Sequence, residues 1–137
     1  MKMSHARLTV LALVSAASAL FVAVPAMAHN TAKKATTVTV TAGKPAEFSF
    51  TLSSKKLKHG PVTFKVTNKG AIPHDFKVCS SNKGGSLNAC AGKVTKMLNV
   101  GQSATLTVTF AKAGTYEYLC TVPGHAAGGM KGDLKVT

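Results

Sequence analysis

The sequence predicts an all-β fold, a two-sheet Greek-key β-sandwich of about eight strands. The first observation is a series of short runs with period-2 alternation, in which β-branched and aromatic residues are enriched. The second is that turn residues, such as those at 42–45, 59–61, 68–70 and 99–102, separate the runs. The third is that no window shows the apolar stripe of an amphipathic helix. Strands spaced in this way favour an antiparallel sandwich.

Ahead of the first strand, residues 1–28 are expected to form a secretory signal peptide. A basic start at Lys2 and Arg7 precedes an apolar run at 8–24, and Ala26-Met27-Ala28 has the small-x-small form of a cleavage site. The alternative is a retained membrane anchor, since the apolar run is nearly long enough to span a bilayer. A cleaved signal predicts an exported protein, either periplasmic or extracellular and cell-surface.

Removal of the signal would leave a flexible N-terminus at 29–35 and one folded domain at 36–137, which is long enough to build its own core. The remaining chain would carry 15 lysines, spread along its length, and 4 acidic residues. Such a surface is either simply solvated or attractive to an acidic partner or an anionic membrane. Nucleic acid is not an expected partner, because the mature chain lacks arginine and has few aromatic residues.

Period-2 alternation also predicts where the side chains of each strand point. Tyr116, Tyr118 and Cys120 share one face, with Tyr118 in the core and Cys120 pointing inward, whereas Leu119 points outward. The eight runs expected to form strands are, in chain order, TTVTVTA (36–42), AEFSFTLS (46–53), PVTFKVTN (61–68), HDFKVCS (74–80), KVTKMLNV (93–100), ATLTVTFA (104–111), GTYEYLC (114–120) and GDLKVT (132–137).

The three cysteines divide into a pair and a single residue. Cys79 and Cys90 flank the polar, glycine-rich run SSNKGGSLNA. In the oxidising compartment that export implies, these two cysteines are expected to form a disulfide, which would stabilise the fold by about 2–3 kcal/mol. Cys120 is left unpaired, and an odd thiol in an exported protein needs a chemical reason.

The neighbours of Cys120 point to a metal. The run CTVPGHAAGGM places Cys120, His125 and Met130 on one loop, and AIPHDF puts His74 at the start of a strand. Two His, one Cys and a more distant Met form a trigonal set with a weak axial ligand, which suits one copper ion in a blue-copper electron-transfer site.

A packing role or a different metal centre fits these residues less well. A buried thiol can pack as a small hydrophobic group, but this leaves the histidines and the methionine without a role. Structural zinc prefers four Cys or His ligands, and iron–sulfur clusters need more cysteines. A binuclear copper centre needs two bridging thiolates on the loop, where this chain has one cysteine.

The motifs NKGAIPHDF (68–76) and YEYLCTVPGHAAGGM (116–130) together resemble those of the cupredoxins, the small blue copper proteins. The resemblance extends over about residues 36–137. It implies a cupredoxin-like domain with His74, Cys120 and His125 as equatorial copper ligands and Met130 as the axial ligand.

Residues next to the predicted ligands are candidates to support them, and family members expose an edge of the second histidine in an apolar patch. Asp75 and Thr121 are candidates to connect the two ligand loops by hydrogen bonds, with ordinary turn chemistry as the alternative. The apolar residues expected to form the patch here, with plain loop packing as the alternative, are Ile72, Leu119, Pro123, Ala126 and Ala127.

The leading functional hypothesis is an exported, monomeric, mononuclear blue copper protein that carries single electrons and docks transiently with acidic redox partners. It is not expected to be an enzyme, because nothing provides an open metal position or an acid–base pair. The alternative is a copper carrier that delivers the metal to an oxidase through the same ligands. A copper-dependent reductase is less compatible with one short domain and few histidines.

Overall fold

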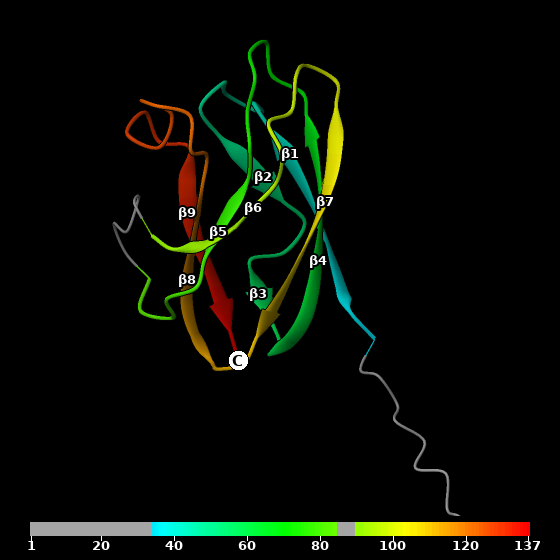
Figure 1. Cartoon of the computed structure of the whole chain (residues 1–137), viewed down its shortest axis with the longest axis vertical. Coiled ribbons are helices and arrows are strands. Elements are labelled where there is room, and N and C mark those ends of the chain that lie inside the picture. Colours follow the sequence, from blue (N-terminus) through cyan, green and yellow to red (C-terminus); the bar gives the residue numbers. More distant parts are fainter. Residues whose placement is uncertain (1–33, 85–89) are drawn as a thin grey trace, which may run out of the picture. The chain divides into compact units, whose positions relative to one another are not determined.

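The computed structural model describes residues 34–84 and 90–137, so the predicted signal peptide at 1–28 and most of the segment at 29–35 lie outside the described residues. The described part forms two sheets and contains no helix that could cross a membrane (Figure 1). The predicted all-β sandwich is therefore confirmed. Its strands are β1 (Thr36–Ala42), β2 (Phe50–Leu52), β3 (Lys56–Leu57), β4 (Gly60–Asn68), β5 (Lys77–Cys79), β6 (Gly92–Val94), β7 (Ser103–Phe110), β8 (Gly114–Leu119) and β9 (Lys131–Val136).

The two sheets are mixed rather than purely antiparallel. One has the strand order β2-β1-β4-β7 and the other β3-β9-β8-β5-β6. Most neighbouring strands are antiparallel, as predicted, but β1 pairs in parallel with β4 and β3 pairs in parallel with β9. After β2 the chain crosses to the other sheet as β3 and then returns as β4, so a crossover and not a hairpin joins β1 to β4. The prediction of antiparallel pairing is wrong for these two pairs.

Three predicted strands are shorter than expected because the chain leaves the sheets there. The run at 74–80 forms a strand only at Lys77–Cys79. The run at 46–53 is extended only at Phe50–Leu52, and the run at 93–100 yields only Gly92–Val94. Beyond β6, Leu98 forms an isolated bridge with His74 through reciprocal backbone hydrogen bonds of 3.1 and 2.8 Å. The two-residue strand β3 is not predicted by the sequence, since so short a pairing has no alternating run to reveal it.

The core lies between the sheets and is built around aromatic rings. Phe64, Phe76 and Tyr118 are at most 2% exposed, which confirms the inward direction predicted for Tyr118. The ring centroid of Phe76 lies 5.4 Å from that of Phe64 and 5.6 Å from that of Tyr118. Burial of each ring contributes about 1.5–3 kcal/mol by removing apolar surface from water. Because Phe76 follows His74 by two residues and Tyr118 precedes Cys120 by two, this packing anchors both ligand-bearing segments.

Leu119 is buried, contrary to the prediction that it points to solvent. It is 2% exposed because Cys79 and Ala126 pack against it, with Cys90 at the edge of the same cluster. The disulfide between Cys79 and Cys90 is present, with the two Cα atoms 5.6 Å apart, and Cys120 is free and buried, as predicted. Alternation gives the direction of Leu119 correctly, but the disulfide and the ligand loop cover that face.

Candidate metal centre

Segments far apart in the sequence meet at the end of the sandwich opposite the C-terminus (Figure 1). His74 stands between β4 and β5, and Cys120 directly follows β8. The loop from Cys120 to β9 carries His125 and Met130. The pairing of β5 with β8 brings the first segment beside the second, so the five-stranded sheet positions all four predicted ligands at one end.

The donor atoms of three predicted ligands converge on one point. The Nδ1 atoms of His74 and His125 lie 3.1 Å apart, and Cys120 Sγ lies 4.0 Å from the first and 3.4 Å from the second. Three donors held in a plane at about 2.0–2.3 Å from one ion are separated by about 3.5–3.8 Å. With exposures of 0%, 6% and 1% for His74, His125 and Cys120, the site is also closed to bulk water.

Met130 lies beside Cys120 in the same buried pocket of side chains. It is 0% exposed and packs in one cluster with Ala42 and Cys120. Its backbone N–H donates to the His125 carbonyl at 2.9 Å, and its carbonyl accepts from the Cys120 N–H at 3.0 Å. The buried Met130 side chain is therefore held next to Cys120, which is compatible with the axial role predicted for it.

Glycines let the loop from Cys120 to Met130 turn back on itself. Gly124 and Gly129 have φ angles of +83° and +108°, which side chains with a Cβ rarely adopt. Between these two turns, the Gly128 N–H donates to the Gly124 carbonyl at 2.8 Å and the Gly129 N–H to the Ala126 carbonyl at 3.1 Å. The loop thus has its own hydrogen bonds, which bring the His125 ring back to within 3.4 Å of Cys120 Sγ.

Asp75 and Thr121 connect the two ligand-bearing segments, as predicted. The Asp75 carboxylate accepts the Thr121 backbone N–H at 2.6 Å, and its other oxygen accepts a short hydrogen bond from the Thr121 hydroxyl. Each residue adjoins a predicted ligand, and both hydrogen bonds are charge-assisted, which makes them stronger than neutral ones. This contact fixes the spacing between His74 and Cys120.

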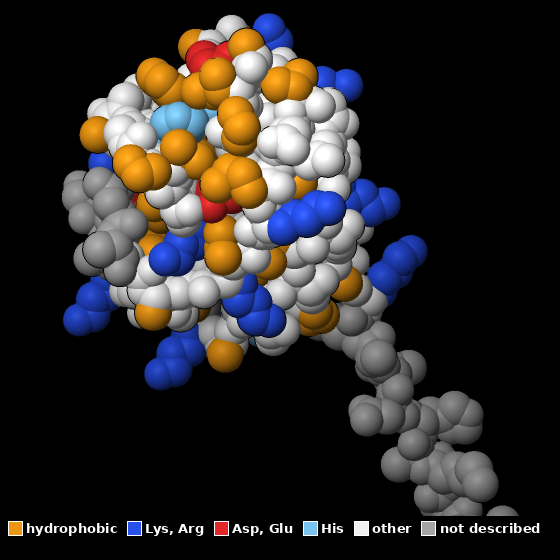
Figure 2. All heavy atoms as spheres, turned by 45° about the horizontal axis from the view of Figure 1, so that its top comes forward, with side chains coloured by type: hydrophobic (Ala, Val, Ile, Leu, Met, Phe, Trp, Pro, Cys, Tyr) orange, Lys and Arg blue, Asp and Glu red, His pale blue; other side chains and the backbone are white. Residues whose placement is uncertain are grey.

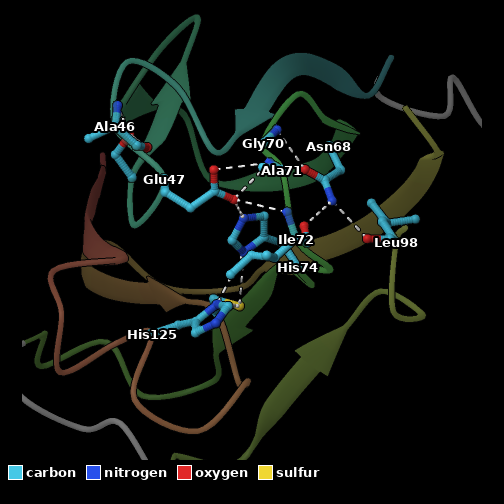
Figure 3. A network of polar contacts seen from close by, with 11 residues as sticks. Ala46, Glu47, Asn68, Gly70, Ala71, Ile72, His74, Leu98 and His125 are labelled. Atoms are coloured by element: carbon cyan, nitrogen blue, oxygen red, sulfur yellow. Dashed lines mark hydrogen bonds and ion pairs between the residues drawn. The ribbon is translucent and has the colours of Figure 1, made fainter. Parts of the chain in front are cut away.

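Asn68 supports the His74 segment in a way the sequence does not reveal. It is 0% exposed, its side-chain amide donates to the carbonyls of Ile72 at 2.8 Å and Leu98 at 2.9 Å, and its side-chain oxygen accepts the Gly70 N–H at 2.9 Å (Figure 3). One buried amide thus satisfies three backbone groups of the loops around His74. The only sequence signal is an Asn in a turn that precedes a histidine.

Glu47 is the second supporting residue that sequence reasoning missed. Its Oε1 lies 2.8 Å from His74 Nε2, the ring nitrogen that faces away from the other donors (Figure 3). The carboxylate also accepts the backbone N–H groups of Ala71 and Ile72 at 2.9–3.2 Å. The Ala71 N–H, together with the His74 ring, lowers the pKa of Glu47 below its ordinary value. The alternating run at 46–53 predicts that Glu47 lies in a strand. It gives no indication that Glu47 lies in a loop and contacts His74.

Burial favours the neutral forms of Cys120 and His125 in the metal-free protein. It raises the pKa of the Cys120 thiol to about 11, and the backbone hydrogen bond from Asp75 opposes this only in part. Burial also lowers the pKa of the His125 imidazole, and the adjacent His74 acts in the same direction. A neutral imidazole is the form that binds metals, and a metal cation has to displace the thiol proton to gain the thiolate. Two imidazoles, a thiolate and a thioether fit copper better than zinc or iron.

An apolar surface surrounds the site, but its residues differ from those predicted. Ile72, Pro123 and Ala127 are exposed or partly exposed as expected, whereas Leu119 and Ala126 are buried at 2% and 8% because they pack against the disulfide. Hydrophobic side chains gather around an exposed histidine edge at this end of the molecule (Figure 2).

Phe48 belongs to this surface and is not predicted by the sequence. It is 41% exposed, and its ring centroid lies 4.8 Å from that of His125. Of the two candidate histidine ligands, only His125 has any exposed surface, 6% against 0% for His74. The surface therefore leads to the metal site through the His125 ring.

The family model that matches this chain describes copper-binding proteins, and the curated relatives that match it include a cuproprotein. A model for copper-binding proteins of the plastocyanin/azurin family matches residues 36–137. Auracyanin-B of Chloroflexus aurantiacus is 54% identical over 43 residues, which cover 31% of this chain and 18% of that protein. The copper-resistant cuproprotein CopI of Rubrivivax gelatinosus is 31% identical over 87 residues, 55% of this chain and 51% of that protein. The chain thus spans about half or less of the length of these curated relatives.

Solved structures give the same result over a larger part of the chain. Auracyanin from Roseiflexus castenholzii is 28% identical with a TM-score of 0.58, and the match covers 77% of this chain and 99% of that one. Rusticyanin from Thiobacillus ferrooxidans is 28% identical with a TM-score of 0.56, covering 77% and 79%.

Proposed function

This chain belongs to the plastocyanin/azurin family of copper-binding proteins, and we propose that it is an exported mononuclear blue copper protein that carries single electrons between redox partners. His74, Cys120 and His125 are the proposed equatorial ligands and Met130 the axial ligand, with one copper per chain. The observation that carries the proposal is the convergence of two imidazole nitrogens and one thiol sulfur within 3.1–4.0 Å in a buried site. Copper supplies one-electron chemistry, since such a ligand set binds both Cu(I) and Cu(II).

The surrounding residues keep the donors in place while the charge of the site changes. Asn68 and Glu47 hold the His74 segment, and Asp75 connects it to the Cys120 loop through Thr121. An electron carrier benefits from such a frame, because donors that barely move require little reorganisation when an electron arrives or leaves. Burial of the ligands excludes water that would otherwise add ligands to the oxidised metal.

The apolar surface around His125 is the proposed route for electrons. Phe48, Ile72, Pro123 and Ala127 contribute to it, and the His125 ring reaches from this surface to Cys120 Sγ, 3.4 Å from its Nδ1. An apolar contact of this kind suits short-lived docking, and the excess of lysines in the chain would steer acidic redox proteins toward the molecule. An anionic membrane surface is a second proposed partner, and the protein is proposed to act as a monomer without substrate turnover.

The second candidate is a copper-binding carrier that delivers or sequesters the metal. The similarity to CopI, a protein named for copper resistance, favours it. The two functions differ in copper exchange. An electron carrier retains its copper through repeated oxidation and reduction, whereas a Cu(I) carrier transfers it to a chelator or acceptor protein and stays colourless.

Visible and EPR spectra after copper addition test the proposal. We expect an intense thiolate-to-Cu(II) band that disappears on reduction and returns on oxidation, at one copper per chain. Cys120→Ser should abolish this band even where some copper stays bound, because a hydroxyl cannot replace the thiolate. A variant spectrum identical to that of the parent would remove Cys120 from the site.

A further inference from the structure

We propose that Glu47 is a positioning residue for the metal site: its carboxylate fixes the tautomer of His74 and stabilises the oxidised metal, which lowers the reduction potential. The inference rests on the proposed function and concerns a residue outside the ligand set. Its starting point is the 2.8 Å contact between Glu47 Oε1 and His74 Nε2.

This contact determines which nitrogen of His74 carries the proton. A carboxylate only accepts hydrogen bonds, so His74 Nε2 has to be the donor. In the neutral imidazole the other nitrogen, Nδ1, then keeps its lone pair. His74 Nδ1 lies 3.1 Å from His125 Nδ1 and 4.0 Å from Cys120 Sγ, so its lone pair is available where the proposed metal donors converge. Glu47 therefore prepares His74 for metal binding before any metal arrives.

The carboxylate itself stays charged and fixed. It accepts the Ala71 N–H at 3.0 Å and the Ile72 N–H at 3.2 Å, and hydrogen bonds to a carboxylate favour its charged form (Figure 3). With its side chain 33% exposed, it remains partly solvated, so no buried, unpaired charge is created. A permanent negative charge therefore lies behind one imidazole ligand.

The position of Glu47 is built into the fold. Ser49 closes the segment, since its hydroxyl donates to the Ala46 carbonyl at 2.6 Å and accepts the Ala46 N–H at 3.2 Å. On the opposite side Gly70 leaves room for the contact, because a Cβ at that position would overlap Glu47 Oε1 and lie 2.9 Å from His74 Nε2. Any larger residue at 70 would push the carboxylate and the ring apart.

The same short segment reaches both histidines. Glu47 contacts His74, and the next residue, Phe48, packs its ring on that of His125. No proposed metal ligand comes from this segment, yet it restrains both imidazoles. Its role is thus to set ligand orientation and charge, which is what outer hydrogen-bond partners do for metal-bound histidines.

A charged hydrogen-bond partner favours the metal state of higher charge. The carboxylate makes the imidazole a stronger donor and adds a negative charge close to the site, and both effects stabilise Cu(II) more than Cu(I). Loss of a partner of this kind typically changes metal affinity by about 10–100-fold. A tenfold loss confined to Cu(II) corresponds to a rise of about 59 mV for a one-electron couple.

Redox titration of Glu47→Gln tests the charge. The amide keeps the shape and an acceptor oxygen but removes the charge, so the copper-loaded variant should keep its visible band and show a more positive potential. Asp133→Asn is the matched control, since it removes the same charge from an exposed position on β9. An equal shift in both variants, or no shift in Glu47→Gln, would overturn the inference.

Nitrogen NMR of the metal-free protein tests the tautomer independently of copper. The parent and Glu47→Gln should show His74 protonated at Nε2, whereas Glu47→Ala, which removes the acceptor, should show a mixture of tautomers. A parent protein with the proton at Nδ1 would contradict the proposal. If the parent binds no copper in a blue site, the proposed function fails, yet this measurement still decides whether Glu47 positions His74.

Discussion

The segment at 68–76 and the loop at 120–130 supply ligands to the same site but are held in different ways. The first is held by residues outside the segment. Glu47 and the backbone of Leu98 form hydrogen bonds to it, and His74 is 0% exposed. The second is held largely by its own turns and by the Asp75–Thr121 contact, and His125 reaches the surface. The first segment therefore anchors the site, and the second brings it to the surface through His125, where the proposed function places the contact with redox partners.

Replacing each histidine by glycine is the strongest test of this contrast. Both His125→Gly and His74→Gly should lose the intense visible band, because each removes an equatorial donor. Added imidazole should restore the band in His125→Gly, since that ring borders the surface, but not in His74→Gly, whose ring is enclosed. The measurement is the visible spectrum of each copper-loaded variant against imidazole concentration. Equal rescue of both would show that the two sides of the site are equally open.

Asn68→Ala tests how the segment at 68–76 is held, and its expected effect is a moderate loss of stability. The variant removes the side-chain partner of the Ile72 carbonyl and the Gly70 N–H, and one of the two donors to the Leu98 carbonyl, which keeps the His74 N–H. We expect a loss of about 2–3 kcal/mol in the free energy of unfolding, measured by denaturant titration of the metal-free protein. Asn99→Ala, at an exposed position, is the control and should change stability little. Similar values for the two variants would mean that the anchor does not depend on Asn68.

Much of the fold could be predicted because its signals are local. Alternation and turn residues indicate the sandwich, and the positions of Cys79 and Cys90 around one polar loop indicate the disulfide. The parallel pairs escaped prediction, since strand direction depends on how the chain crosses between sheets. The exposure predicted for Leu119 is wrong because alternation gives a direction and cannot say what covers that face.

The ligands could be predicted from the sequence because each lies in a motif whose residue types and spacing are specific to a metal site. Asp75 and Thr121 could be found because they adjoin those motifs in the sequence. Glu47 lies 27 residues before His74, within an alternating run that is typical of a strand. Phe48 lies next to it, and neither residue carries a motif of its own. Contacts between distant loops depend on the three-dimensional arrangement, which no local pattern records.

A crystal structure of the copper-loaded protein would decide the ligand assignment on which the proposed function depends. We predict one copper ion bound by Nδ1 of His74, Sγ of Cys120 and Nδ1 of His125, with the Met130 sulfur as a longer axial contact and His74 Nε2 still bonded to Glu47. Copper bound through Nε2 of His74, or at a place that excludes Cys120 Sγ, would contradict this assignment.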